Sequence, residues 1–91
     1  MSRIHVERPH SIGREAARAK AEKLADKLSR EHGVSSEWQG DTLVFKRSGV
    51  DGRIEVGDDK VAVDVKLGLM LSAMSGLLKG EIERALDKAL A

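Results

Sequence analysis

Residues 48–67 read SGVDGRIEVGDDKVAVDVKL, and their pattern is the strongest structural signal in the chain. Apolar and polar residues alternate on both sides of Gly57–Lys60, a segment with the composition of a tight turn. Alternation with a period of two indicates strands that bury one face and expose the other to water. We therefore predict a β-hairpin whose valine-rich face belongs to the core.

The charges on the polar face fix the register of this hairpin. Pairing across the turn would bring together Val56 with Val61, Arg53 with Asp64, and Asp51 with Lys66. Two of these pairs are opposite in charge, and opposite charges on facing residues stabilise a sheet. A shift by one residue would turn the valines to solvent, so the register is strongly specified.

Composition sets the broad class of the protein. The chain has 91 residues, of which 41% are hydrophobic, 34% charged and only 2% aromatic, so we expect a single domain, residues 1–91, with an aliphatic core. The absence of cysteine fits a reducing compartment. A net charge of +1 is too small to predict nucleic-acid binding. We see no secretory signal after Met1, and no apolar run approaches the ~20 residues needed for a transmembrane segment.

The remaining segments complete the predicted order of elements. We expect strands at Arg3–Arg8, Val34–Trp38 and Thr42–Arg47, and a bend or bulge at Ser48–Gly52. The first helix should span Ile12–His32, with Ser11 as N-cap and Gly33 at its end. The last helix should include Leu78, Ile82, Ala85, Leu86 and Ala89. Because residues 1–32 hold eight Lys/Arg against five Asp/Glu, the first helix is basic. It presents either an ordinary solvated face or a surface attracted to anionic lipid.

The predicted fold class is α+β with the order β-α-β-β-β-β-α. Five mostly antiparallel strands would form one sheet with both helices on one face. The order of the strands stays open, and an exposed edge strand leaves homodimerisation open. The expected core residues are Ile4, Val6, Leu24, Leu28, Trp38, Leu43, Phe45, Ile54, Val56, Val61, Val63, Val65, Ile82 and Leu86.

Residues that could carry chemistry do not converge in the sequence. The three histidines, His5, His10 and His32, lack the spacing of helical metal ligands. Asp51, Asp58 and Asp59 fall in turns, where aspartate commonly bonds the local backbone. We therefore predict no catalytic residue, no cofactor-binding residue and no metal ligand, and expect that the protein is not an enzyme.

The apolar run Leu69–Leu78 is the one stretch that could carry function. It either folds over the end of the core or stays exposed as a patch for an apolar surface or ligand. The candidate residues are Leu69, Met70, Leu71, Met74 and Leu77. If the run is α-helical, Met70 and Met74 share one face and Leu71 projects elsewhere.

The sequence also resembles the small bacterial polyhydroxyalkanoic acid system proteins of the granule gene region. The resemblance covers about residues 4–90 and rests on Arg8-Pro9-His10, on Trp38-Gln39-Gly40-Asp41-Thr42 with Phe45, on Ser48–Gly52, and on Leu67-Gly68 through Ile82-Glu83. It implies a bacterial cytoplasmic protein linked to storage-polyester granules and implies no catalytic residue. The order of elements is similar to a shortened START-like helix-grip fold, at the level of fold alone.

Three functions remain open on this basis. The first is a non-enzymatic accessory protein of the polyhydroxyalkanoate system that binds the granule surface or a granule-coat protein. The second is a carrier or enzyme for a small hydrophobe, with a pocket between the sheet and the last helix, and the third is a plain protein-interaction module. A pocket lined by Trp38, Phe45, Met70 and Met74 would favour the second function, and a solid core with an exposed apolar run would favour the first.

Overall fold

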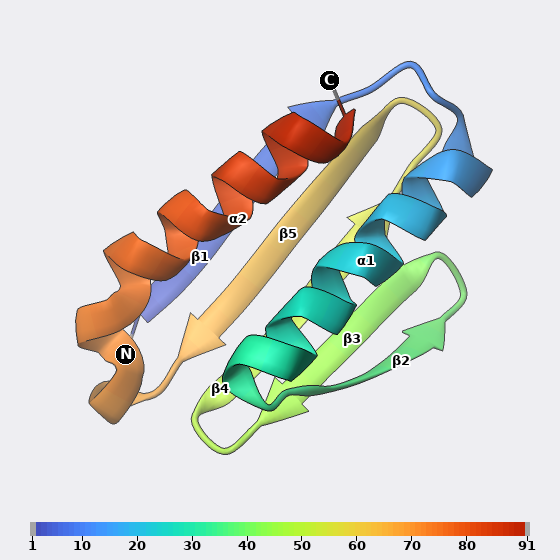
Figure 1. Ribbon diagram of the computed structural model, residues 1–91. Coiled ribbons are helices and arrows are strands. Elements are labelled where there is room, and N and C mark those ends of the chain that lie inside the picture. Colours follow the sequence, from blue (N-terminus) through green and yellow to red (C-terminus); the bar gives the residue numbers. More distant parts are fainter. Residues whose placement is uncertain (1, 91) are drawn as a thin grey trace.

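The computed structural model describes residues 2–90 and has the predicted α+β architecture (Figure 1). Its elements are β1 (Ser2–Pro9), α1 (Arg14–His32), β2 (Ser35–Gln39), β3 (Thr42–Arg47), β4 (Val50–Val56), β5 (Lys60–Leu67), the 3₁₀ helix η1 (Leu69–Met74) and α2 (Ser75–Leu90). The order β-α-β-β-β-β-α is confirmed.

The five strands form one open antiparallel sheet in the order β1-β5-β4-β3-β2. Strands β2 to β5 follow one another as a meander, and β1 adds to the free edge of β5. Both helices lie on the same face: α2 runs along β1, and α1 lies over β2, β3 and β4 (Figure 1). The other face of the sheet carries no helix, so its side chains meet water.

The predicted register of the central hairpin is confirmed. In the central hairpin Val56 pairs with Val61, Arg53 with Asp64, and Asp51 with Lys66. In the preceding hairpin Gln39 pairs with Thr42, Trp38 with Leu43, and Ser36 with Phe45. On the helix-free face Arg3 Nε donates to Asp64 Oδ1 at 2.8 Å and links β1 to β5. This hydrogen bond and the charge of Arg3 hold the pKa of Asp64 below its usual value.

The core matches the prediction except at Trp38. The other predicted core residues are all buried, and Val34, Leu67 and three alanines of α1 join them. Trp38 is only half-buried, because it lies on the edge strand β2. Its ring lies 3.9 Å from the guanidinium carbon of Arg18, and its Nε1 donates to Glu22 Oε1 at 3.3 Å. Trp38 therefore covers the side of α1 and does not fill the core.

The segment Ser48–Gly52, predicted to be a bend or bulge, contains a tight turn at Ser48 and Gly49 and no bulge. Arg47 pairs directly with Val50, which leaves a two-residue turn in which Gly49 has a φ of 82°. Gly52 is instead a regular strand residue opposite Phe45. A Cβ atom at Gly52 would lie 2.4 Å from Phe45 Cζ, so the absence of a side chain there makes room for the aromatic ring.

Helix α1 begins two residues later than predicted, and Ser11 is not its N-cap. The N-cap position is Gly13, with a φ of 85°, and its carbonyl accepts a hydrogen bond from Ala17 N at 3.0 Å. The predicted C-terminus is confirmed, because Gly33 is left-handed with a φ of 70° and donates to Ser29 O. Arg47 Nη1 donates to the carbonyl of His32 at 2.6 Å, which ties this helix end to β3.

Candidate functional site

The apolar run after β5 is an ordered element at one end of the molecule. The Gly68 N–H donates to Gly49 O at 2.9 Å, so the run starts against the β3–β4 turn. Ser72 Oγ donates to the carbonyl of Gly68 at 3.0 Å and closes the first turn of η1. Helix α2 then continues from Ser75 without an intervening loop. The run is therefore a structured connection between β5 and α2.

Helix η1 has one exposed side and one side that faces the core. Leu69 is 80% exposed and Met70 94%, and Leu77 in the first turn of α2 is 65% exposed. Leu71 is half-buried against the core, and Met74 lies at the boundary with 36% exposed. A 3₁₀ helix has three residues per turn, so Leu71 and Met74, three apart, face the same way. The shared face of Met70 and Met74 was predicted only for an α-helical run, and it does not arise in the 3₁₀ geometry of η1.

We call Leu69, Met70 and Leu77 the apolar tip. Beside it lies an open groove of about 590 Å³ that η1 and the β3–β4 turn line together. The groove is lined by Arg47, Ser48, Gly49, Gly68, Leu69, Met70 and Leu71. Exposed leucine and methionine side chains next to an open groove are typical of a surface that meets an apolar partner.

A basic row lies next to the apolar tip, on the helix-free face of the sheet. Lys46 and Lys66 both pair across the sheet with Asp51, so two ammonium groups flank one carboxylate. Within residues 2–90 neither lysine has an ion-pair partner within 4.0 Å. These three residues line a depression that reaches Gly68, where η1 begins. The row therefore presents net positive charge close to the start of η1, where Leu69 is exposed.

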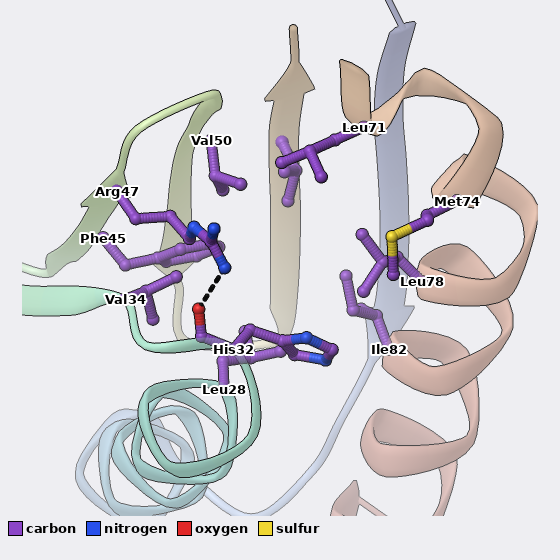
Figure 2. A pocket seen from close by; sticks show the side chains of 11 residues that line it. Leu28, His32, Val34, Phe45, Arg47, Val50, Leu71, Met74, Leu78 and Ile82 are labelled. Atoms are coloured by element: carbon purple, nitrogen blue, oxygen red, sulfur yellow. Dashed lines mark hydrogen bonds between the residues drawn. The ribbon is translucent and has the colours of Figure 1, made fainter.

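A small cavity lies on the inner side of η1 (Figure 2). Its volume is about 70 Å³, and the two helices, the sheet and η1 all contribute to its wall. The lining residues are Leu28, His32, Val34, Phe45, Arg47, Val50, Val65, Leu71, Met74, Leu78 and Ile82. Phe45 and Met74 are in the predicted set, whereas Trp38 and Met70 lie elsewhere. Pockets for drug-sized ligands measure ~300–1,000 Å³, so this cavity is too small to enclose one.

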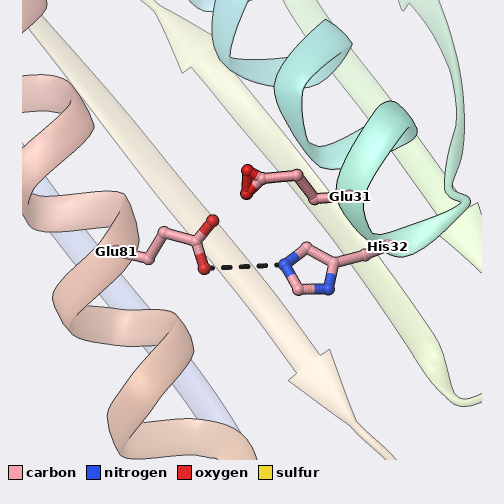
Figure 3. A group of neighbouring side chains, drawn as sticks. All are labelled: Glu31, His32 and Glu81. Carbon is pink, nitrogen blue, oxygen red and sulfur yellow. Dashed lines mark ion pairs between the residues drawn. The ribbon is translucent and has the colours of Figure 1, made fainter.

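The structure brings together one group of titratable side chains that the sequence analysis did not identify. Glu31 and His32 end α1, and Glu81 approaches them from α2 (Figure 3). One ligand atom from each of the three lies within 4.8 Å of the others. Local patterns in the sequence did not indicate this group, because the two helices are distant in sequence and meet only in the folded structure.

The other histidines and the turn residue Asp58 contact neighbouring groups of the protein. His5 lies on the helix-free face, 3.6 Å from Glu7. His10 is buried, and its Nε2 lies 3.0 Å from the carbonyl of Gly57 in the β4–β5 turn. Since that carbonyl accepts and the Ile12 amide donates to His10 Nδ1, the neutral Nε2–H form satisfies both contacts. Asp58 forms an ion pair with Arg14 at 3.0 Å.

The residues that carry the family resemblance hold elements together. Arg8 joins β1 to α2 through Asp87 at 2.8 Å and Glu83 at 3.1 Å. Asp41 accepts hydrogen bonds from Arg14 at 2.8 Å and Arg18 at 2.9 Å, at the start of α1. Two arginines of the basic first helix are thus paired within the molecule, which weakens the reading of that helix as a lipid-attracting surface.

The fold and the candidate site together define a small α+β protein. Both of its helices cover the same face of the sheet, and its apolar tip lies beside the basic row. The chain belongs to the family described as "Putative polyhydroxyalkanoic acid system protein", whose model matches residues 4–90. No curated protein and no solved structure matches the chain. Among the described residues, no helix combines the length and apolar character needed to traverse a bilayer.

Proposed function

We propose that this protein is a non-enzymatic accessory protein of the polyhydroxyalkanoate system that attaches to the storage granule through its apolar tip. The proposal places it in the cytoplasm, at the granule surface. Family membership supports the link to the polyester system. The observation that carries the mode of attachment is the exposure of Leu69 and Met70 on an element that is hydrogen-bonded to the rest of the fold.

The apolar tip supplies the attractive free energy in this mechanism. Fully burying a leucine or methionine side chain yields about 1.5–3 kcal/mol. Three such side chains therefore give several kcal/mol, from which the cost of immobilising the protein is subtracted. Because η1 is already ordered, attachment requires little further loss of conformational entropy.

The basic row orients the protein on a granule coated with anionic phospholipid. Lys46 and Lys66 would meet phosphate groups while the tip enters the apolar layer, each contributing about 1 kcal/mol near such a surface. This electrostatic part is screened over ~10 Å at 0.1 M salt. Attachment through the tip alone would persist at high salt, so the salt dependence separates the two contributions.

Co-sedimentation with purified granules tests the proposal. We expect the Leu69→Gln/Met70→Gln variant to lose most of its granule binding while its melting temperature stays within a few degrees of the wild type, because both side chains are exposed in the free protein. The matched control is Ile12→Gln, which also replaces an exposed apolar residue. The segment between β1 and α1 that contains it lies at the other end of the molecule from η1 (Figure 1).

The outcomes are distinct for each alternative. Binding to granules and to phospholipid-coated polyester beads alike identifies the lipid surface as the target. Binding to native granules alone points to a granule-coat protein. Undiminished binding of the double variant, or equal loss in Ile12→Gln, would rule out the apolar tip as the attachment site.

The second candidate function is binding of a small hydrophobe in the cavity beneath η1. The position of the cavity, between the sheet and α2, favours it (Figure 2). Its volume of about 70 Å³ requires η1 to move before a chain of more than a few carbons could enter. Methyl NMR shifts of Val65 and Leu71 on addition of a medium-chain hydroxy fatty acid would reveal such binding.

A further inference from the structure

We infer that Glu31, His32 and Glu81 form a binding site for a transition-metal dication, Zn²⁺ in particular, that joins α1 to α2. The three side chains offer one imidazole nitrogen and two carboxylate oxygens (Figure 3). Three protein ligands of this kind with further positions left for water are typical of open zinc sites.

The distances fit a zinc ion after a small side-chain movement. With bond lengths of about 2.0–2.2 Å, a tetrahedral zinc ion holds its ligand atoms roughly 3.3–3.6 Å apart. His32 Nε2 and Glu81 Oε2 already lie 3.5 Å apart. Glu31 is exposed and its ligand atom is within 4.8 Å of both, so a rotation of this unconstrained side chain completes the set.

The imidazole nitrogen that faces the carboxylates lacks a hydrogen-bond partner. His32 Nε2 is buried and forms no hydrogen bond to any described residue. A buried polar atom that has lost its hydration and gained no partner destabilises the fold. A metal ion between His32 and Glu81 would satisfy this nitrogen and both carboxylates at once.

The local charge also favours a cation. Elsewhere in the fold acidic side chains face arginines, as Asp41, Asp64 and Asp87 do. Within residues 2–90, Glu81 has His32 as its one ion-pair partner and Glu31 has none within 4.0 Å. Both Glu31 and His32 lie in the last turn of α1, where the helix dipole is negative. Glu31 adds negative charge in this turn and Glu81 adds it from α2, while Arg47 Nη1 donates to the carbonyl of His32 at the same helix end.

Titration of the chelator-treated full chain with zinc chloride tests the inference. We expect saturable binding of one Zn²⁺ per chain and a melting temperature that rises with zinc concentration, because the ion holds two helices together. Magnesium chloride should have little effect, since Mg²⁺ prefers a shell of oxygen ligands that includes several waters. Long-range ¹H–¹⁵N spectra should show a zinc-dependent shift at His32 Nε2.

Variants locate the site. His32→Gln should abolish binding, and Glu31→Gln, a change at an exposed residue that leaves the fold intact, should weaken it about tenfold or more. The matched control is His5→Gln, which removes another histidine with acidic neighbours and should leave zinc affinity unchanged. Absence of saturable binding, an unshifted His32 Nε2 signal, or full affinity in Glu31→Gln would overturn the inference.

Discussion

The ring of Phe45 occupies the space above Gly52, its partner on the neighbouring strand. This contact explains why a glycine is tolerated within the central part of a sheet, where it would otherwise cost stability. The aromatic ring fills the volume that a side chain would occupy, and both residues are buried. At the scale of single residues, this pair is a packing contact that an added side chain would disturb.

We predict that Gly52→Ala lowers the free energy of unfolding by about 1–3 kcal/mol, the usual cost of forcing extra volume into a packed core. The added Cβ would lie 2.4 Å from Phe45 Cζ, so the ring has to move. Urea denaturation measures the effect. Gly76→Ala is the control, because a Cβ there meets nothing within 4 Å and alanine favours the helix. Equal stability of the two variants would contradict the packing role of Gly52.

At the scale of elements, η1 shows how the type of helix decides which side chains are exposed. Leu71 turns to the core, close enough to the β3–β4 turn that a Cβ at Gly49 would lie 3.2 Å from Leu71 Cδ1. Met70, the adjacent residue, contributes almost nothing to the core because its side chain is in solvent. Two neighbouring apolar residues thus have separate roles, one in anchoring η1 and one in the proposed attachment.

We predict that Leu71→Ala destabilises the protein and that Met70→Ala does not. The loss at Leu71 should be smaller than the ~2–5 kcal/mol of a fully buried leucine, because Leu71 is half-buried. The change at Met70 should stay within about 0.5 kcal/mol, as is usual at the surface. Thermal melts followed by circular dichroism compare the two. A larger loss at Met70 would mean that η1 packs in the opposite orientation.

At the scale of the whole molecule, the strands differ in how well the fold protects them from solvent. Strands β4 and β5 each have a neighbour on both sides, and their inward residues Ile54, Val61 and Val63 are buried. Strand β2 is an edge and has no fully buried residue. Homodimerisation through an edge strand stays a prediction, and β2 offers an exposed backbone edge for it.

We predict that amide hydrogen exchange is slowest in β4 and β5 and much faster in β2, because opening an edge strand exposes little apolar surface. Exchange measured by NMR at two protein concentrations checks this. If β2 is as protected as β5 at high concentration and loses that protection on dilution, a second copy of the chain covers it. If β2 and β5 exchange equally slowly at both protein concentrations, the predicted difference between the edge strand and the central strands is wrong.

Local patterns in the sequence determined the order of the elements, the register of the central hairpin and nearly all of the core. They could do so because period-two alternation and turn composition act over a few residues. The apolar run could also be recognised as a candidate site, because its composition is visible in the sequence without knowledge of the tertiary structure.

Only the tertiary structure decided which distant segments meet. The placement of β1 beside β5 depends on which sheet edge is free once the meander has formed. The half-exposure of Trp38 follows from the edge position of β2, and the division between Met70 and Leu71 follows from the 3₁₀ geometry of η1. Glu31, His32 and Glu81 become neighbours because α1 and α2 pack on the same face. Each of these outcomes depends on contacts between residues far apart in the chain, which no local pattern encodes.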